Sequence, residues 1–290
     1  MKKHREDNLE NQDKIEQKKK ISKYEIFRRA MLTVCICLTA ALALQLSISI
    51  VDYVQARISS SEILEGVSDI TKPEEEFIVG SSPITDFDVE VDVNSSYSEY
   101  FSEWLEIIKE TKQKHPDFVG YIEIENLDIL YPILKSDDNV YYLDHLIDGT
   151  KNKSGEIFMD YRNNPFPLTD NQNIVLYGHN MSDGTKFHNL TKLRKEEYYY
   201  NSPINIITED GIFTFTVFSF YRTDNNADFT PLTFDYESNF GMFCVTEQAK
   251  SMYESNFKFT GKEVILTLST CVNDFGGRWC THAVLTSITK

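Results

Sequence analysis

The sequence predicts a mostly β domain of eight strands, preceded by one transmembrane helix. Residues 30–51 carry no charged side chain, and they match the length of about twenty residues that crosses a bilayer. From residue 118 onward, short β-branched and aromatic runs bounded by turn residues recur toward the C-terminus. With 290 residues, 41% of them hydrophobic, the chain is long enough to bury a sizeable core.

The 29 N-terminal residues form a basic tail, with ten Lys or Arg against six Asp or Glu. The positive-inside rule keeps such a tail in the cytoplasm, which predicts a single-pass protein of the cell membrane with its larger part outside. A cleaved signal peptide is the alternative, but the apolar run is long and no clear cleavage site follows it.

The charge distribution excludes nucleic-acid binding. The chain carries a formal net charge of −16, and residues 30–290 alone carry −20. This part lacks the basic stripe that contacts to phosphate groups require. Its acidity favours solubility at the cell surface or the attraction of a cationic substrate segment.

Residues 52–96 are rich in Glu, Asp and Ser, which predicts an acidic linker or stalk. Apolar residues then recur at steps of three and four up to Lys114, a pattern typical of an amphipathic helix that packs on a domain. Pro116 ends this helix, and the folded domain is predicted to span residues 97–290. The residues of the apolar stripe are Tyr97, Phe101, Trp104, Leu105 and Ile108.

The domain itself is predicted to be mostly β. Gly211 follows an acidic pair and supplies a tight turn between two strands. Two helical insertions, at residues 186–199 and 240–253, interrupt the series. The predicted strands cover residues 118–124, 127–133, 155–160, 173–177, 204–208, 212–221, 264–270 and 278–288.

Cys271 stands at the end of the seventh predicted strand, and Arg278 begins the eighth. A thiol at a strand end is semi-exposed and backed by rigid sheet, and a nearby arginine favours the thiolate or stabilises an oxyanion. Antiparallel pairing of the two strands would bring these residues together. A buried structural cysteine and a disulfide between Cys271 and Cys280 are the alternatives.

A histidine could complete this arrangement. His179 lies just past the strand at residues 173–177, where a base for Cys271 can be seated. His282 is a rival base on the same face of the last strand as Arg278, but four residues, about 13 Å of strand, separate the two. His145 and His188 are interpreted as structural or surface residues. The order His, Cys, Arg differs from papain-like proteases, in which the cysteine comes first.

Several separated segments resemble the class B sortases, over about residues 97–288. The similar segments are Thr267-Leu268-Ser269-Thr270-Cys271 followed by Arg278, Tyr177-Gly178-His179-Asn180-Met181, and residues 120–133, 141–145 and 154–163. The resemblance implies a sortase-type eight-stranded β-barrel with an N-terminal helix and helical insertions. It also implies that residues 240–253 help to select the substrate.

The resemblance further implies a cysteine transpeptidase that needs no cofactor. Cys271 would be the nucleophile, His179 the proton-transfer group and Arg278 the group that binds substrate backbone and steadies the oxyanion, while Ser269 would line the substrate groove. The substrates would be secreted proteins with a C-terminal sorting motif, and the acceptor would be an amine of peptidoglycan.

Two other classes remain as alternatives. A non-catalytic, membrane-tethered binding module would leave Cys271 unreactive. An L,D-transpeptidase would also pair cysteine with arginine, but the chain has no Ser-x-Gly-Cys segment. A metal site has no support, because no Cys-x-x-Cys, His-Glu-x-x-His or EF-hand spacing occurs.

Overall fold

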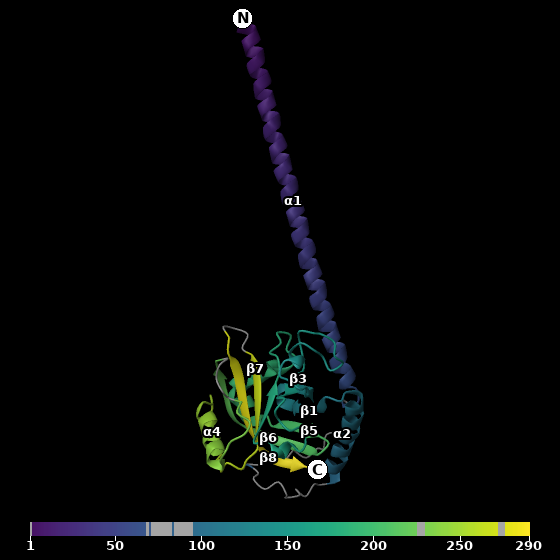
Figure 1. The fold of residues 1–290 in the computed structure, drawn as a ribbon, viewed down its shortest axis with the longest axis vertical. Helices are drawn as coiled ribbons and strands as arrows, with labels where there is room; N and C mark the ends of the chain where they lie inside the picture. The colour runs from purple at the N-terminus through teal and green to yellow at the C-terminus, as the bar shows by residue number, and fades with distance from the viewer. Residues whose placement is uncertain (1, 68–69, 71–82, 84–94, 225–229, 272–275) are drawn as a thin grey trace. The chain divides into compact units, whose positions relative to one another are not determined.

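A computed structural model describes residues 2–67, 70, 83, 95–224, 230–271 and 276–290 of the chain. It divides into two compact units, Met1–Val54 and Gln55–Lys290. Helix α1 (Lys2–Ile63), purple in Figure 1, contains the predicted span and is long and apolar enough to cross a membrane. Most of the predicted acidic linker, residues 68–69, 71–82 and 84–94, lies outside the described residues.

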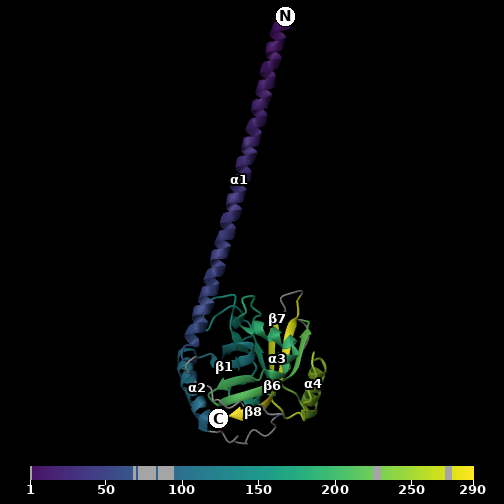
Figure 2. The same ribbon diagram turned by 180° about the vertical axis from the view of Figure 1, so that it is seen from behind.

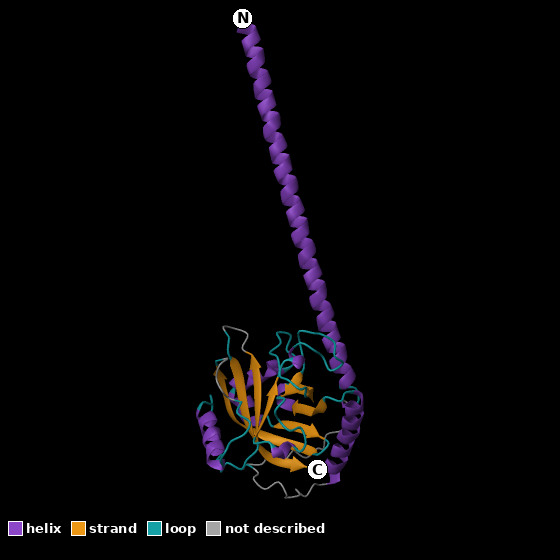
Figure 3. Ribbon diagram, viewed as in Figure 1, coloured by secondary structure: helices purple, strands orange, loops and turns teal. Residues whose placement is uncertain are grey.

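The described strands form a closed barrel, as the orange ribbons of Figure 3 show. Around the barrel their order is β1-β2-β3-β4-β7-β8-β6-β5. Strand β2 is parallel to β3 and β4 is parallel to β7, whereas the other neighbours are antiparallel. The strands are β1 (Phe118–Ile124), β2 (Ile129–Leu134), β3 (Ile157–Met159), β4 (Asn173–Tyr177), β5 (Ile204–Thr208), β6 (Gly211–Thr223), β7 (Ile265–Cys271) and β8 (Arg278–Thr289). The predicted eight-stranded barrel is confirmed.

Most residues of the described strands are buried on both faces of the sheet. Side chains alternate across a strand, so Leu266 and Leu268 of β7 join the large interior cluster. Ile265 of the same strand lies in a separate cluster with Phe240 and Cys244 of helix α4 (Glu237–Ala249). Helix α4 therefore covers the outer face of β7 and its neighbours, and Figures 1 and 2 show it on the side of the barrel opposite α2.

Helix α2 (Ser95–Lys114) packs on the barrel through three residues of the predicted stripe, Phe101, Trp104 and Ile108. Trp104 is fully buried, and its ring centroid lies 5.2 Å from that of Tyr121 in β1. The Tyr121 hydroxyl lies 3.0 Å from the Thr111 hydroxyl and 3.3 Å from the carbonyl oxygen of Ile63, to which it donates. Residues at the end of α1 thus belong to the packed domain, N-terminal of the predicted boundary at residue 97.

Val67→Ala is expected to lower the free energy of unfolding of the domain by about 1 to 2 kcal/mol. Val67 is buried in the cluster formed by α2 and the outer face of the barrel, so the change removes two buried methyl groups. Urea unfolding of the full chain, followed by tryptophan fluorescence, measures the change. Val54→Ala, at an exposed position, is the control. If both changes lower the free energy of unfolding equally, residue 67 does not belong to the folded unit.

Both predicted helical insertions are present with different limits. The first consists of the 3-10 helix η5 (Phe187–Arg194) followed by α3 (Glu196–Asn201), because the extended backbone of Lys195 interrupts the helix. The second is α4, which begins three residues before the predicted start. Three short 3-10 turns complete the described helices: η2 (Glu125–Leu127), η3 (Tyr141–Leu143) and η4 (Leu168–Asp170).

Candidate active site

The parallel pair of β4 and β7 brings the two halves of the site together. Tyr177 is the register partner of Ser269, and the Gly178 amide donates to the Ser269 carbonyl at 3.2 Å. His179 follows Tyr177 by two residues, and Cys271 follows Ser269 by two residues. Because parallel strands run in step, His179 and Cys271 leave the same edge of the barrel at the same level.

The antiparallel pair of β7 and β8 adds Arg278 to this edge. Cys271 is the last residue of β7, and its register partner is Arg278, the first residue of β8. The prediction that antiparallel pairing brings these two residues together is confirmed. Arg278 is partly buried, and the intervening residues 272–275 lie outside the described part of the chain.

The His179 ring is oriented by a backbone carbonyl. Its Nε2 lies 2.7 Å from the carbonyl oxygen of Leu143 in η3. A carbonyl oxygen only accepts hydrogen bonds, so Nε2 carries a proton in both charge states of the ring. The neutral ring is therefore the Nε2–H tautomer, and Nδ1 is the nitrogen that can gain and lose a proton.

The backbone of His179, like its ring, is held by a hydrogen bond. The Phe187 amide donates to the His179 carbonyl at 2.9 Å, which closes a loop over residues 179–187. At Gly178, an added Cβ would lie 2.6 Å from Cδ2 of the Phe187 ring. No side chain fits there without displacing that ring, so glycine lets Phe187 pack directly against the start of the loop.

A buried carboxylate supports the strand that leads to His179. Asp160 is fully buried and accepts from Nε and Nη2 of Arg162, both at 2.8 Å, from Tyr177 at 3.0 Å and from Asn139 at 2.9 Å. Burial by itself would raise the pKa of Asp160, and these hydrogen bonds outweigh it, so the pKa is lowered. Burial and the neighbouring carboxylate raise the pKa of Tyr177 to about 12.

Comparison with known proteins shows which family the chain belongs to. The sortase domain model matches residues 122–286, more than half of the chain. The chain belongs to the sortase family. Sortase B of Listeria monocytogenes is 35% identical over 166 residues, which cover 57% of this chain and 66%, just under two thirds, of that protein.

Solved sortase structures share the fold. Clostridium perfringens sortase B matches with a TM-score of 0.58 and 29% identity, covering 62% of this chain and 99% of that one. The Staphylococcus aureus sortase B–substrate complex matches with a TM-score of 0.60 and 27% identity, covering 65% and 90%. These relatives are all sortase B, and the chain is accordingly a class B sortase.

His282, the rival base, lies in the core of the sortase domain. It is fully buried, with Nδ1 2.9 Å from the Thr267 hydroxyl and Nε2 3.5 Å from a Glu247 carboxylate oxygen. Burial lowers the pKa of His282, although Glu247 opposes this shift. A ring enclosed in this way cannot exchange protons with a substrate, which agrees with the preference for His179.

The other two candidate histidines make local contacts, as predicted. The His145 Nδ1 lies 2.9 Å from the Tyr141 carbonyl oxygen, and its ring stacks on the Tyr141 ring. The His188 Nδ1 lies 2.8 Å from the side-chain oxygen of Asn180. Both rings therefore support the turns around the site.

The described thiols of the sortase domain are buried and unbridged. Cys280 and Cys244 are free cysteines without exposed surface, so the alternative of a disulfide between Cys271 and Cys280 is wrong. Burial raises the pKa of Cys280 to about 12 and also raises that of Cys244. Neither thiol is a competing nucleophile near neutral pH.

The burial of Ser269 argues against its predicted role in substrate binding. Its side chain has no exposed surface. Its hydroxyl has no hydrogen-bond partner among the described residues. A groove-lining residue needs accessible surface, so the structure corrects this expectation.

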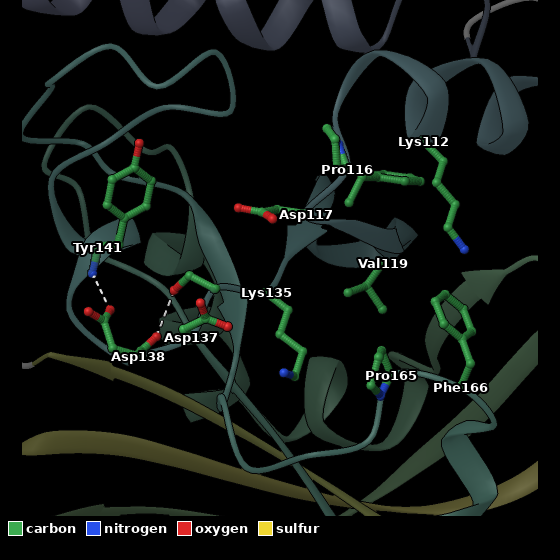
Figure 4. A pocket seen from close by; sticks show the side chains of 12 residues that line it. Lys112, Pro116, Asp117, Val119, Lys135, Asp137, Asp138, Tyr141, Pro165 and Phe166 are labelled. Carbon is green, nitrogen blue, oxygen red and sulfur yellow. Dashed lines mark hydrogen bonds between the residues drawn. The ribbon is translucent and has the colours of Figure 1, made fainter.

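A cavity of about 410 Å³ lies near the start of β1 (Figure 4). The ammonium group of Lys112 lies 4.1 Å from the centre of the Phe166 ring, and Asp138 accepts from the Tyr141 amide at 2.8 Å. Tyr141 borders the cavity, whereas Leu143, two residues later in η3, contacts His179. None of the described residues that line the cavity is a predicted catalytic residue of the sortase.

Proposed function

We propose that the chain is a membrane-anchored transpeptidase that cleaves a C-terminal sorting motif of secreted proteins and joins the acyl fragment to an amine of the cell wall. The observation that supports this most strongly is the strand register that collects His179, Cys271 and Arg278 at one edge of the barrel. A nucleophile, a proton-transfer group and a fixed cation are the parts that thiol acyl transfer requires.

In the first step the Cys271 thiolate attacks a backbone carbonyl carbon of the motif. A carbon–sulfur bond forms, and the carbonyl oxygen becomes an oxyanion beside the Arg278 guanidinium. The carbon–nitrogen bond then breaks, and protonated His179 gives its Nδ1 proton to the departing amine. The product is a thioacyl enzyme, and the C-terminal fragment leaves with a free amino group.

In the second step the acceptor amine attacks the thioacyl carbon. Neutral His179 takes a proton from this amine at Nδ1 while Nε2–H remains on the Leu143 carbonyl. The carbon–sulfur bond breaks, a new amide bond forms, and Cys271 returns to the thiolate. Proton transfer by a positioned side chain contributes about 10²- to 10⁴-fold to such steps.

The proposed partners follow from the family and from α1. Staphylococcus aureus sortase B has been solved as a complex with substrate, which supports a protein substrate for this chain as well. Peptidoglycan is the proposed source of the acceptor amine. The length and composition of α1 support anchoring in the cell membrane, and the basic tail supports a cytoplasmic N-terminus.

The full chain in detergent micelles should form a thioacyl adduct with a peptide of the correct motif. Peptides carrying Asn-Pro-x-Thr and Ser/Pro-Pro-x-Thr motifs form the test panel, and intact-protein mass spectrometry detects the added fragment. Peptide mapping is expected to place it on Cys271, and an added amine should discharge it as a new amide. Absence of an adduct, with Cys271 alkylated no faster than Cys280, would indicate a non-catalytic binding module instead.

A further inference from the structure

We propose that a buried ion pair between Lys186 and Glu156 positions His179 for proton transfer, an inference that rests on the proposed function. The Lys186 ammonium donates to the Glu156 carboxylate, and both side chains are almost completely buried, at 2% and 1% exposure. Thirty residues separate the two in the sequence. The pair therefore joins two segments that the chain itself does not hold together.

Lys186 lies at the far end of the loop that begins with His179. It forms an isolated antiparallel bridge with Asn180, and the next residue, Phe187, donates to the His179 carbonyl at 2.9 Å. These contacts make the loop a closed unit. A displacement of Lys186 is consequently transmitted to the backbone of His179.

Glu156 belongs to the segment that orients the ring of the same histidine. Its amide donates to the Tyr142 carbonyl at 2.9 Å. The preceding Gly155 approaches η3 so closely that an added Cβ would lie 2.7 Å from the Leu143 carbonyl oxygen. That oxygen is the acceptor for His179 Nε2–H, so the ion pair links the loop that carries His179 to the turn that orients it.

The backbone of Lys186 indicates that its position is imposed by tertiary contacts. Its φ is +56° and its ψ is −129°, a conformation that L-residues rarely adopt. The Lys186 amide donates to the Tyr131 hydroxyl at 3.0 Å, and the ammonium lies 5.2 Å from the centre of the Tyr131 ring. Such strain persists where surrounding structure over-determines a residue, typically beside functional sites.

Energetics favour a positioning role over a stabilising one. A buried ion pair adds little net stability compared with apolar residues of the same size, because both charges lose their hydration. Its directional contact nevertheless restricts the two segments to one arrangement. Loss of both charges should therefore affect the geometry of His179 more than it affects folding.

Kinetics of the full chain provide the first arm of the test. A misplacement of about 1 Å can lower the rate of a catalysed step roughly 100-fold. Lys186→Met and Glu156→Gln are each expected to lower kcat about 10- to 100-fold while KM changes by less than about twofold. Lys192→Met, which removes an exposed pair with Asp128, is the matched control and should retain the parental kcat. Equal effects of Lys186→Met and Lys192→Met would overturn the inference.

Nitrogen NMR of the His179 ring provides the second arm, which does not depend on activity. In the parent, a sample labelled at histidine nitrogens should show protonated Nε2 and unprotonated Nδ1 for neutral His179, assigned by loss of the signals in His179→Gln. In Lys186→Met and Glu156→Gln the Nε2–H signal should shift toward that of a solvated ring. An unchanged signal in both would overturn the inference.

The double variant Lys186→Met with Glu156→Leu covers the case in which a single change leaves an unpaired charge that unfolds the domain. We expect it to fold, as judged by tryptophan fluorescence, and to show the same change in the His179 signal. A parental signal in the folded double variant would overturn the inference. Failure of the parent to form a thioacyl adduct would instead reject the proposed function, while the NMR arm still decides how His179 is positioned.

Discussion

Cys271→Ala is expected to lower cleavage of the sorting peptide and transfer to an amine by at least about 10⁴-fold. In the proposed mechanism this change removes the sulfur that forms the covalent intermediate. The described thiols Cys244 and Cys280 are buried with raised pKa values and cannot replace it. Release of the C-terminal peptide fragment, followed by chromatography over hours, measures both the parent and the variant.

The matched control for this change is the double variant Cys35→Ala with Cys37→Ala. These thiols are exposed on α1, outside the barrel. Their removal shows whether the loss of any cysteine thiol, rather than that of Cys271, lowers the activity. We expect the double variant to retain the parental rate within about twofold. Residual activity clearly above about 0.01% in Cys271→Ala would show that another group attacks the carbonyl.

Glu247→Ala is expected to lower the free energy of unfolding by about 3 to 5 kcal/mol, the range for breaking a buried charge pair. Glu247 of α4 is 2% exposed; its carboxylate accepts from the Tyr221 hydroxyl, pairs with Lys250 at 2.7 Å and lies 3.5 Å from His282. The alanine variant leaves His282 and the Tyr221 hydroxyl without this partner inside the protein.

Fluorescence of the two tryptophans during urea unfolding measures this effect, because Trp104 and Trp279 both lie in the unit Gln55–Lys290. Glu237→Ala is the control on the same helix, where an exposed carboxylate should contribute less than about 1 kcal/mol. Equal effects of the two changes would mean that the buried cluster does not hold α4 on the barrel.

The same carboxylate gives the stability a defined dependence on pH. Burial opposes ionisation of Glu247, but the contacts with His282, Lys250 and Tyr221 outweigh it and lower its pKa from 4.5 to about 2. A lowered pKa stabilises the folded state above pH 4.5, and this contribution, about 3 kcal/mol, is lost as the pH falls toward 2. Glu247→Gln should flatten the stability profile across that window, and an unchanged profile would contradict the assignment.

Local sequence patterns predicted the strands because their apolar and β-branched runs are bounded by turn residues. The limits of β1, β4 and β5 agree with the prediction. The single helix predicted over residues 186–199 was less accurate, since periodicity does not reveal the extended backbone of Lys195 that separates η5 from α3. The parallel pairing of β4 with β7 is a contact between distant segments, for which the pattern alone has no signal.

The site was predictable where residues stand beside each other on adjacent strands, as Cys271 and Arg278 do. The contact that orients the His179 ring could not be predicted from the sequence. Its acceptor lies 36 residues away and is a backbone carbonyl oxygen, which any residue type carries. Asp160 and Arg162 lie in a segment that resembles the family, but the pattern assigned them no role. Ser269 was misjudged because alternation along a strand does not reveal that both faces of β7 are covered.

The position of β8 in the barrel determines when, during synthesis of the chain, the barrel can close. This strand pairs with both β6 and β7, so it completes the ring of strands and carries Arg278, the register partner of Cys271. Ribosomes add it after the other described strands of the barrel, and until it arrives β6 and β7 each present an unpaired edge. A chain still in synthesis therefore holds Cys271 at an open edge of an incomplete barrel, without its register partner Arg278.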